Sequence, residues 1–86
     1  MNAFQLKVKT RHDVPMYTLR GYKLRGIMYG QGDIPVEQKE VALPEIAAGA
    51  EIAIALTFSE SVVPRGVKFD VLRPTGLSAY TRNWKP

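Results

Sequence analysis

Hydrophobic and polar residues alternate along four stretches of the chain, and this period of two is typical of half-buried β-strands. The four stretches are Phe4–Lys9, Tyr22–Tyr29, Glu51–Phe58 and Val67–Leu72. The third is the clearest, because one face carries only large apolar side chains, namely Ile52, Ile54, Leu56 and Phe58. Each such side chain contributes about 1.5–3 kcal/mol when it is fully buried. We therefore expect this face to lie in the core.

Two further strands are expected from weaker patterns. Pro35–Ala42 has a proline at its start and three charged residues within it, which suits a strand at a sheet edge. Leu77–Trp84 is the last strand expected. Gly30–Asp33, the segment LPEIAAGAE at 43–51, and Pro74–Gly76 are turn signals, and 11–19 and 59–66 are expected to be loops.

The pattern predicts an all-β fold, an antiparallel β-sandwich of six to seven strands of the immunoglobulin or fibronectin-III type. No stretch has a sustained helical period, and 86 residues suffice for one domain, 1–86.

No run approaches the roughly 18 apolar residues of a membrane span, and the start lacks the apolar core of a signal peptide. The compartment of the chain is not determined by its sequence.

Gly26 interrupts the core face of the second strand, between Leu24 and Met28. A glycine inside a strand often marks a bulge or a close approach by another group. The expectation at Gly26 is therefore either a bulge or a close approach by another group.

The charge changes sign along the chain. Residues 1–30 hold six Lys/Arg and one Asp, a net +5; residues 31–60 hold six acids and one Lys, a net −5; residues 61–86 hold five Lys/Arg and one Asp, a net +4. These blocks sum to the net charge of +4. The interpretation that we favour is that oppositely charged strands pair across a sheet, rather than that a basic face binds nucleic acid.

No catalytic constellation is visible. His12 is the sole histidine, so a histidine-rich metal site and a triad with Ser59 or Ser61 are not supported. There is no cysteine, which excludes disulfides and thiolate zinc ligands. No pair of carboxylates is placed for glycoside hydrolysis, and no glycine-rich phosphate motif occurs. We expect no catalytic residue, no metal and no cofactor.

Aromatic side chains are the remaining candidates for contacts. Tyr80, Arg82 and Trp84 are expected on one face of the last strand, and Tyr29 lies with Lys23 and Arg25 on the second. Exposed aromatic rings stack on sugars or bases. A tryptophan near a chain end also closes a core or packs on a neighbouring domain, and we favour that interpretation. The candidate carbohydrate or domain-interface residues are Tyr29, Tyr80, Arg82 and Trp84.

The segment from YKLRGIM through GQGDIPVEQKEVALPEIAAGAEIAIAL resembles the immunoglobulin-like sandwich domains of family 2, β-galactosidase-like, glycoside hydrolases. The resemblance rests on Tyr22 and Leu24, the turn after Tyr29, and the turn from Leu43 to Gly49. It covers the central half of the chain and, more loosely, the tail FDVLRPTGLSAYTRNW. Gly26 stands where the family carries tryptophan, so Phe58 or Phe69 would have to fill that volume. The family's catalytic carboxylates lie in its barrel, and none transfers to this chain.

The resemblance implies a non-catalytic accessory domain of a carbohydrate-active enzyme, and a C-terminal fragment of a secreted or periplasmic parent. Its expected partner is a catalytic barrel or another neighbouring domain. The alternatives are an autonomous module that binds polysaccharide and, less favoured, a small nucleic-acid-binding β-barrel. Six strands are one short of a seven-stranded sandwich, so a free sheet edge is also expected to pair weakly with a second copy.

Overall fold

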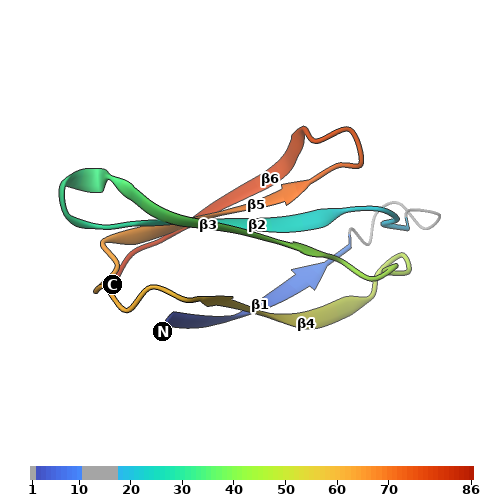
Figure 1. Cartoon of the computed structure of the whole chain (residues 1–86). Helices are drawn as coiled ribbons and strands as arrows, with labels where there is room; N and C mark the ends of the chain where they lie inside the picture. Colours follow the sequence, from blue (N-terminus) through green and yellow to red (C-terminus); the bar gives the residue numbers. More distant parts are fainter. Residues whose placement is uncertain (1, 11–17) are drawn as a thin grey trace.

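The chain folds into six antiparallel strands arranged in two sheets (Figure 1). The structure is a computed structural model that describes residues 2–10 and 18–86. The strands are β1 (Asn2–Lys9), β2 (Lys23–Tyr29), β3 (Pro35–Ala42), β4 (Glu51–Phe58), β5 (Gly66–Leu72) and β6 (Ser78–Trp84), with the 3-10 turn η1 (Gln31–Asp33) between β2 and β3. The predicted all-β sandwich is confirmed in its six-stranded form.

The two sheets are unequal. Within the described residues, the smaller sheet consists of β1 and β4, whereas the larger sheet has the order β3-β2-β5-β6. Hairpins join β2 to β3 and β5 to β6, and the other connections cross between the sheets (Figure 1). All pairs are antiparallel, and the register sets Phe4 opposite Leu56 and Gly26 opposite Phe69.

The predicted strand boundaries hold to within two residues. β3 and β4 have the predicted bounds, β1 begins two residues before Phe4, and β6 begins one residue after Leu77. Most of the predicted loop at 11–19, with His12 in it, lies outside the described residues. Leu19 departs from a simple loop, because its backbone exchanges hydrogen bonds of 2.9 and 3.1 Å with Ile46.

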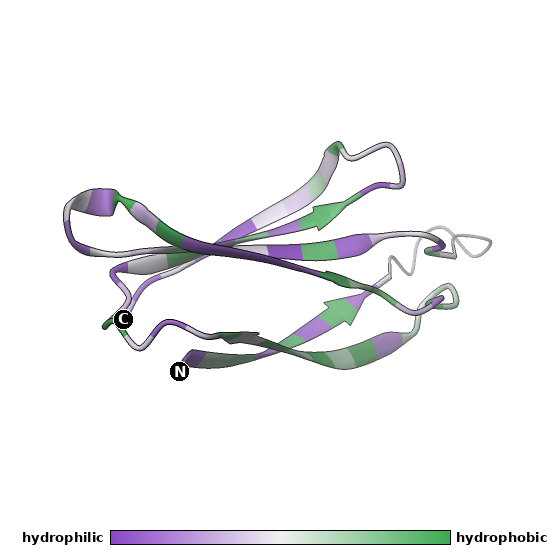
Figure 2. Ribbon diagram, in the orientation of Figure 1, coloured by the Kyte–Doolittle hydropathy of each residue, from purple (hydrophilic) through white to green (hydrophobic). Residues whose placement is uncertain are grey.

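The core lies between the sheets, where the apolar faces of the strands meet. Alternating hydrophobic and hydrophilic residues are visible along β1 and β2 (Figure 2). The most deeply buried apolar side chains come from β2, β4, β5 and the segment between β3 and β4, namely Met28, Leu56, Phe58, Val67 and Ile46. Ile52 and Ile54 point to the same side of β4 as Leu56 but are only half-buried.

At Gly26 the structure shows a close approach by neighbouring side chains, and the register is regular there, so the alternative of a bulge is wrong. A Cβ atom added there would collide with Cδ2 of Leu56 and would lie 2.8 Å from Cζ of Phe58. The ring of Phe69 stands 3.5 Å away on the neighbouring strand. The missing side chain is therefore replaced by aliphatic and aromatic groups from β4 and β5.

Basic and acidic residues face one another across strands, as the charge pattern predicts. Arg25 of β2 stands between Glu40 of β3 and Asp70 of β5 in the register, and Lys9 stands opposite Glu51. Arg25 and Asp70 form an ion pair of 3.0 Å, but this pair joins the two blocks that are both net basic. Arg20 and Glu45, from the first and second blocks, form an ion pair of 3.3 Å between loop segments. The strand register thus agrees with the charge reversal at Arg25–Glu40 and Lys9–Glu51, whereas the Arg25–Asp70 ion pair does not follow it.

Candidate functional site

Trp84 is partly buried and packs against the core. Its ring meets the ring of Phe4 edge-on, with centroids 5.0 Å apart and an interplanar angle of 74°. Phe4 makes further edge contacts with Phe58 and Phe69, at 5.9 and 5.6 Å. Edge-to-face pairs of this kind add about 0.5–1.5 kcal/mol beyond the buried area. The indole thus ties β6 to β1, as expected for a packing role.

Tyr80 and Arg82 lie on the same side of β6 as Trp84 but are not covered. Tyr80 pairs with Val71 and Arg82 with Phe69, so both side chains extend toward the layer between the sheets. Tyr80 is nevertheless 62% exposed, and Arg82 is also exposed. The smaller sheet does not reach this end of β6.

Tyr29 stands at the end of β2, opposite Gly66 of β5. A shallow hollow of about 400 Å³ opens there, and Trp84 shares its lining. The remaining lining residues are Asp33, Arg65, Gly66, Val67, Lys68, Asn83 and Lys85. The structure therefore brings two of the four predicted contact residues, Tyr29 and Trp84, to one hollow, and leaves Tyr80 and Arg82 outside its lining.

The hollow beside Tyr29 has the character of a weak binding surface. Its charged lining comprises Arg65, Lys68 and Lys85 against Asp33. The charged side chains of this lining are thus predominantly basic.

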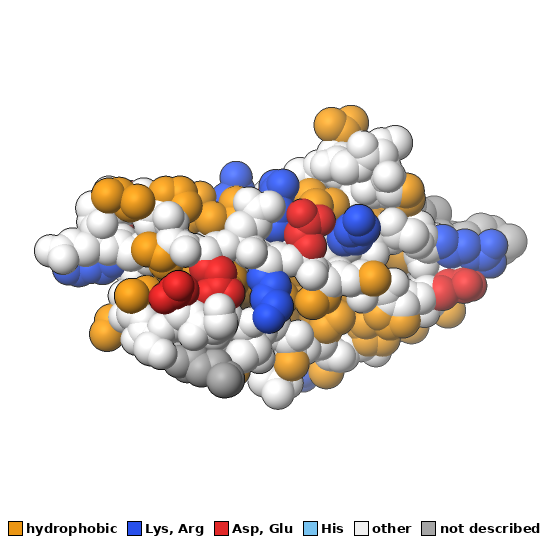
Figure 3. Space-filling view, in the orientation of Figure 1, with side chains coloured by type: hydrophobic (Ala, Val, Ile, Leu, Met, Phe, Trp, Pro, Cys, Tyr) orange, Lys and Arg blue, Asp and Glu red, His pale blue; other side chains and the backbone are white. Residues whose placement is uncertain are grey.

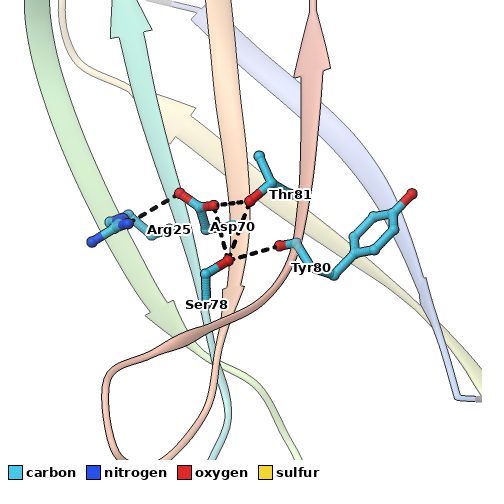
Figure 4. Close-up of polar contacts among 5 residues, drawn as sticks. All are labelled: Arg25, Asp70, Ser78, Tyr80 and Thr81. Carbon is cyan, nitrogen blue, oxygen red and sulfur yellow. Dashed lines mark hydrogen bonds and ion pairs between the residues drawn. The ribbon is translucent and has the colours of Figure 1, made fainter.

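A buried polar cluster on the large sheet was not anticipated from the sequence (Figure 4). Asp70 is 1% exposed, and its carboxylate accepts hydrogen bonds from Arg25 Nη2 at 3.0 Å, from Ser78 Oγ at 3.2 Å and from Thr81 Oγ1. The oxygen of Ser78 also lies 3.2 Å from that of Thr81 and 3.4 Å from the carbonyl of Tyr80. The one feature of the sequence that could have indicated this cluster is Asp70 itself, a charged residue in the middle of the largely apolar strand β5.

The electrostatics of this cluster keep Asp70 ionised. Burial raises the pKa of Asp70, but the hydrogen bonds from Thr81 and Arg25, with the nearby Lys68 and the Ser78 hydroxyl, outweigh it and hold the pKa below its ordinary value. An ionised, fully hydrogen-bonded carboxylate is a poor proton donor. No histidine stands among the described residues to activate Ser78 or Thr81. The cluster is a structural link across β2, β5 and β6.

A second carboxylate, on Glu37, joins β3 to the loop that follows β4. It accepts hydrogen bonds from the backbone N–H groups of Ser59 and Glu60 at 3.0 and 2.9 Å, and from the Ser59 hydroxyl at 3.2 Å. The Ser59 backbone hydrogen bond, followed by that of Glu60, lowers the pKa of Glu37. These hydrogen bonds connect the outer strand of the larger sheet, β3, to the segment that follows β4 of the smaller sheet.

Exposed apolar side chains gather at one end of the sandwich. Ile34, Val36, Val62 and Val63 are 62%, 39%, 40% and 84% exposed. A hollow of about 500 Å³ lies among them, lined by Gly30, Gln31, Val36, Val62, Val63, Pro64, Arg65 and Pro86. Figure 3 shows hydrophobic side chains at the end of the molecule where the C-terminus lies in Figure 1. We call Ile34, Val36, Val62, Val63, Pro64 and Pro86 the apolar end.

Neither a metal site nor a membrane span is found in the part of the chain that the structure describes. Residues 2–10 and 18–86 contain no group of three or more His, Cys, Asp or Glu side chains that could hold a metal ion. The same residues form no helix that is long and apolar enough to cross a membrane.

Comparison with known proteins returns no match: no family model, no curated protein and no solved structure is similar to this chain.

Proposed function

We propose that this chain is a non-catalytic accessory domain that packs against a neighbouring protein domain through its apolar end. The observation that carries the proposal is the gathering of exposed valines around one hollow, with Val63 84% exposed. Contiguous apolar patches on a protein surface mark sites of interaction. The absence of a catalytic constellation among the described residues agrees with a role in assembly rather than in chemistry.

The proposed neighbour is the catalytic barrel of a carbohydrate-active enzyme, and the proposed classification of the sandwich is immunoglobulin-like. Both come from the resemblance of the central half of the chain to the family 2 glycoside hydrolases. Gly26 departs from the family's tryptophan, and the classification requires that other side chains fill that volume, which Leu56, Phe58 and Phe69 do. The apolar end supplies the surface that such a neighbour would cover.

The test begins with the reading frame that encodes the chain and the frames beside it. The proposal expects a catalytic domain in one of them. That domain is then produced with this chain, and their association is measured by calorimetry for the native sequence, for Val63→Asp and for the matched control Glu40→Ala on the large sheet. Val63→Asp should abolish association, and the control should not. A neighbour that binds equally well to all three proteins contradicts the proposal.

The hollow that Tyr29 and Trp84 share favours one second candidate, a module that binds polysaccharide. Titration against a panel of polysaccharides distinguishes the accessory domain from the polysaccharide-binding module. The variants Tyr29→Ala and Tyr80→Ala are titrated beside the native protein, because both lie outside the aromatic core. The accessory-domain proposal expects no heat of binding. Binding that is lost in Tyr29→Ala would replace it with the carbohydrate module. Binding of single-stranded DNA that weakens steeply with salt would instead support the nucleic-acid alternative.

A further inference from the structure

Two unpaired strand edges lie on the same side of the sandwich. Among residues 2–10 and 18–86, β1 pairs with β4 alone in the smaller sheet, and β6 pairs with β5 alone in the larger sheet. The edge contact between Phe4 of β1 and Trp84 of β6 shows that these edges are neighbours across the two layers. We call the free edge of β1, together with Tyr80 and Arg82 of β6, the open flank.

The opposite side of the sandwich is closed. There β3 and β4 are the outer strands, and the Glu37 carboxylate bonds the backbone of Ser59 and Glu60 across them. β3 also carries Pro35 and several charged side chains, which protect a strand edge from pairing. In β1 the charges Lys7 and Lys9 lie in the second half, whereas the first five residues, NAFQL, contain neither a charge nor a proline. Arg82 is the single charge in β6. The first half of β1 and most of β6 therefore lack the protection that β3 has.

The open flank has the shape of a step. Leu56 and Phe58 of β4 lie beneath Gly26 of β2, and Phe4 of β1 lies beneath Phe69 of β5 and Trp84 of β6. The smaller sheet ends there, whereas β6 extends beyond it with Tyr80 and Arg82 uncovered. The larger sheet thus overhangs the smaller one by part of a strand, and the recess beneath it is bounded by the free edge of β1.

A step of this kind is complementary to itself. Rotation by 180° about an axis between the layers and parallel to the strands brings the overhanging β6 of a second copy into the recess beside β1. The same rotation brings β6 of the first copy beside β1 of the second. Two continuous sheets result, each of four plus two strands. Two-fold symmetry of this closed type is the commonest arrangement of soluble homo-oligomers.

Strand direction agrees with this pairing. Phe4, near the start of β1, meets Trp84, the last residue of β6, so the two strands run in opposite directions. Rotation about an axis parallel to the strands keeps their directions, so β1 and β6 of the second copy pair antiparallel. With Phe4 level with Trp84, Gln5 then stands opposite Asn83 of the second copy, and Leu6 stands opposite Arg82. Gln5 and Asn83 face outward, whereas Leu6, Tyr80 and Arg82 face the interior.

We propose that this protein forms a two-fold symmetric dimer in which the free edge of β1 pairs with the free edge of β6 of a second copy. Each pairing satisfies backbone donors and acceptors that are open in the single chain. The two Arg82 side chains are the only charges that this arrangement brings between the layers, and their mutual repulsion keeps the dimer weak. The named pairing residues of β1 and β6 include none of the exposed side chains Ile34, Val36, Val62 and Val63, so the dimer and the proposed docking of a neighbouring domain are tested by different variants.

Sedimentation of the whole chain over a range of concentrations up to about 1 mM tests the dimer, because a Kd of that order is detectable there. The native protein should show a concentration-dependent dimer. Tyr80→Asp, which places a charge in the pairing surface, should weaken it about tenfold or more. Arg82→Leu should strengthen it by a similar factor. The matched controls Val63→Asp and Arg65→Leu at the apolar end should leave it unchanged. A strict monomer, or a dimer lost in Val63→Asp and kept in Tyr80→Asp, overturns the proposal.

A disulfide test checks the proposed register between β1 and β6 of the two copies, and it is possible because the native chain has no cysteine. Gln5 and Asn83 point outward from different sheets, so within one copy they stand farther apart than the layer spacing of about 10 Å, and a disulfide cannot join them. In the dimer they are cross-strand neighbours. The double variant Gln5→Cys with Asn83→Cys should therefore form covalent dimers on mild oxidation, whereas Gln5→Cys with Glu40→Cys should not. Equal cross-linking of the two double variants also overturns the proposal.

Discussion

The carboxylate of Asp70 binds Nη2 of Arg25 at 3.0 Å, although both residues belong to the face of the large sheet that is turned away from the core. Arg25 is 28% exposed and covers Asp70, which is only 1% exposed. The hydroxyls of Ser78 and Thr81 complete the shell around the carboxylate. A side chain in the middle of the sheet is thereby buried without a second layer above it.

Asp70→Ala should destabilise the fold by about 2–3 kcal/mol, because the two hydroxyls and the guanidinium lose a charged acceptor. Nε of Arg25 already has no hydrogen-bond partner among the described residues. Removing Asp70 would therefore leave a second nitrogen of the same guanidinium group, Nη2, without its acceptor. Urea unfolding followed by the fluorescence of Trp84 measures the change. Thr81→Val is the matched control, since it removes one hydrogen bond and should cost about 1 kcal/mol. Equal losses in the two variants would contradict a central role for Asp70.

The stability of the fold should fall in acid. Burial raises the pKa of Asp70, but hydrogen bonds from Thr81 and Arg25 outweigh it; backbone hydrogen bonds from Ser59 and Glu60 lower the pKa of Glu37. A lowered pKa in the folded state means that the unfolded chain binds protons more readily, so acid favours unfolding. The contribution is complete above the ordinary values, 3.8 for Asp70 and 4.5 for Glu37, and is lost as the pH falls below them.

A series of urea titrations between neutral pH and pH 3 measures this dependence. The double variant Asp70→Asn with Glu37→Gln should be less stable at neutral pH and should lose less stability on acidification. If the free energy of unfolding falls equally steeply with pH in the native protein and in the double variant, other carboxylates determine the acid response.

Gly26→Ala should destabilise the fold by about 1–3 kcal/mol, because the added methyl group enters a filled core. The atoms that it meets belong to Leu56 and Phe58, which are both 0% exposed and have no free space into which to move. Thermal unfolding checks this. Ala53→Val, on the exposed face of β4, adds bulk without a core neighbour and should change stability by less than about 0.5 kcal/mol. A neutral Gly26→Ala would show that the core can relax there.

The sequence predicts most of the fold because its signals are local. Alternation along Glu51–Phe58 requires only that one side of a strand face the core, and Pro35 with its neighbouring charges suffices to predict an edge strand. The close approach at Gly26 could also be anticipated, since a missing side chain in a core face must be filled by neighbours.

Contacts that depend on register between distant strands could not be predicted. Asp70 meets Arg25 and Thr81 only because β5 pairs with β2 and β6 in one register, and a shift of one residue would turn it to the core. The same limit applies to Tyr29 and Trp84, which reach one hollow from different strands, while Tyr80 extends away from it. Composition records which residues are present but not which strands become neighbours.

Glu37→Gln should loosen the connection between β3 and the loop after β4. The carboxylate accepts three hydrogen bonds, from the backbone N–H groups of Ser59 and Glu60 and from the Ser59 hydroxyl. A glutamine offers one carbonyl oxygen and a donor that repels N–H groups, so at least one bond is lost, along with the charge that strengthens the others. Hydrogen exchange of the Ser59 and Glu60 amides, followed by NMR, should become faster. Glu40→Gln on the same strand is the control and should leave both rates unchanged. Unaltered exchange in Glu37→Gln would show that the loop is held by its backbone alone.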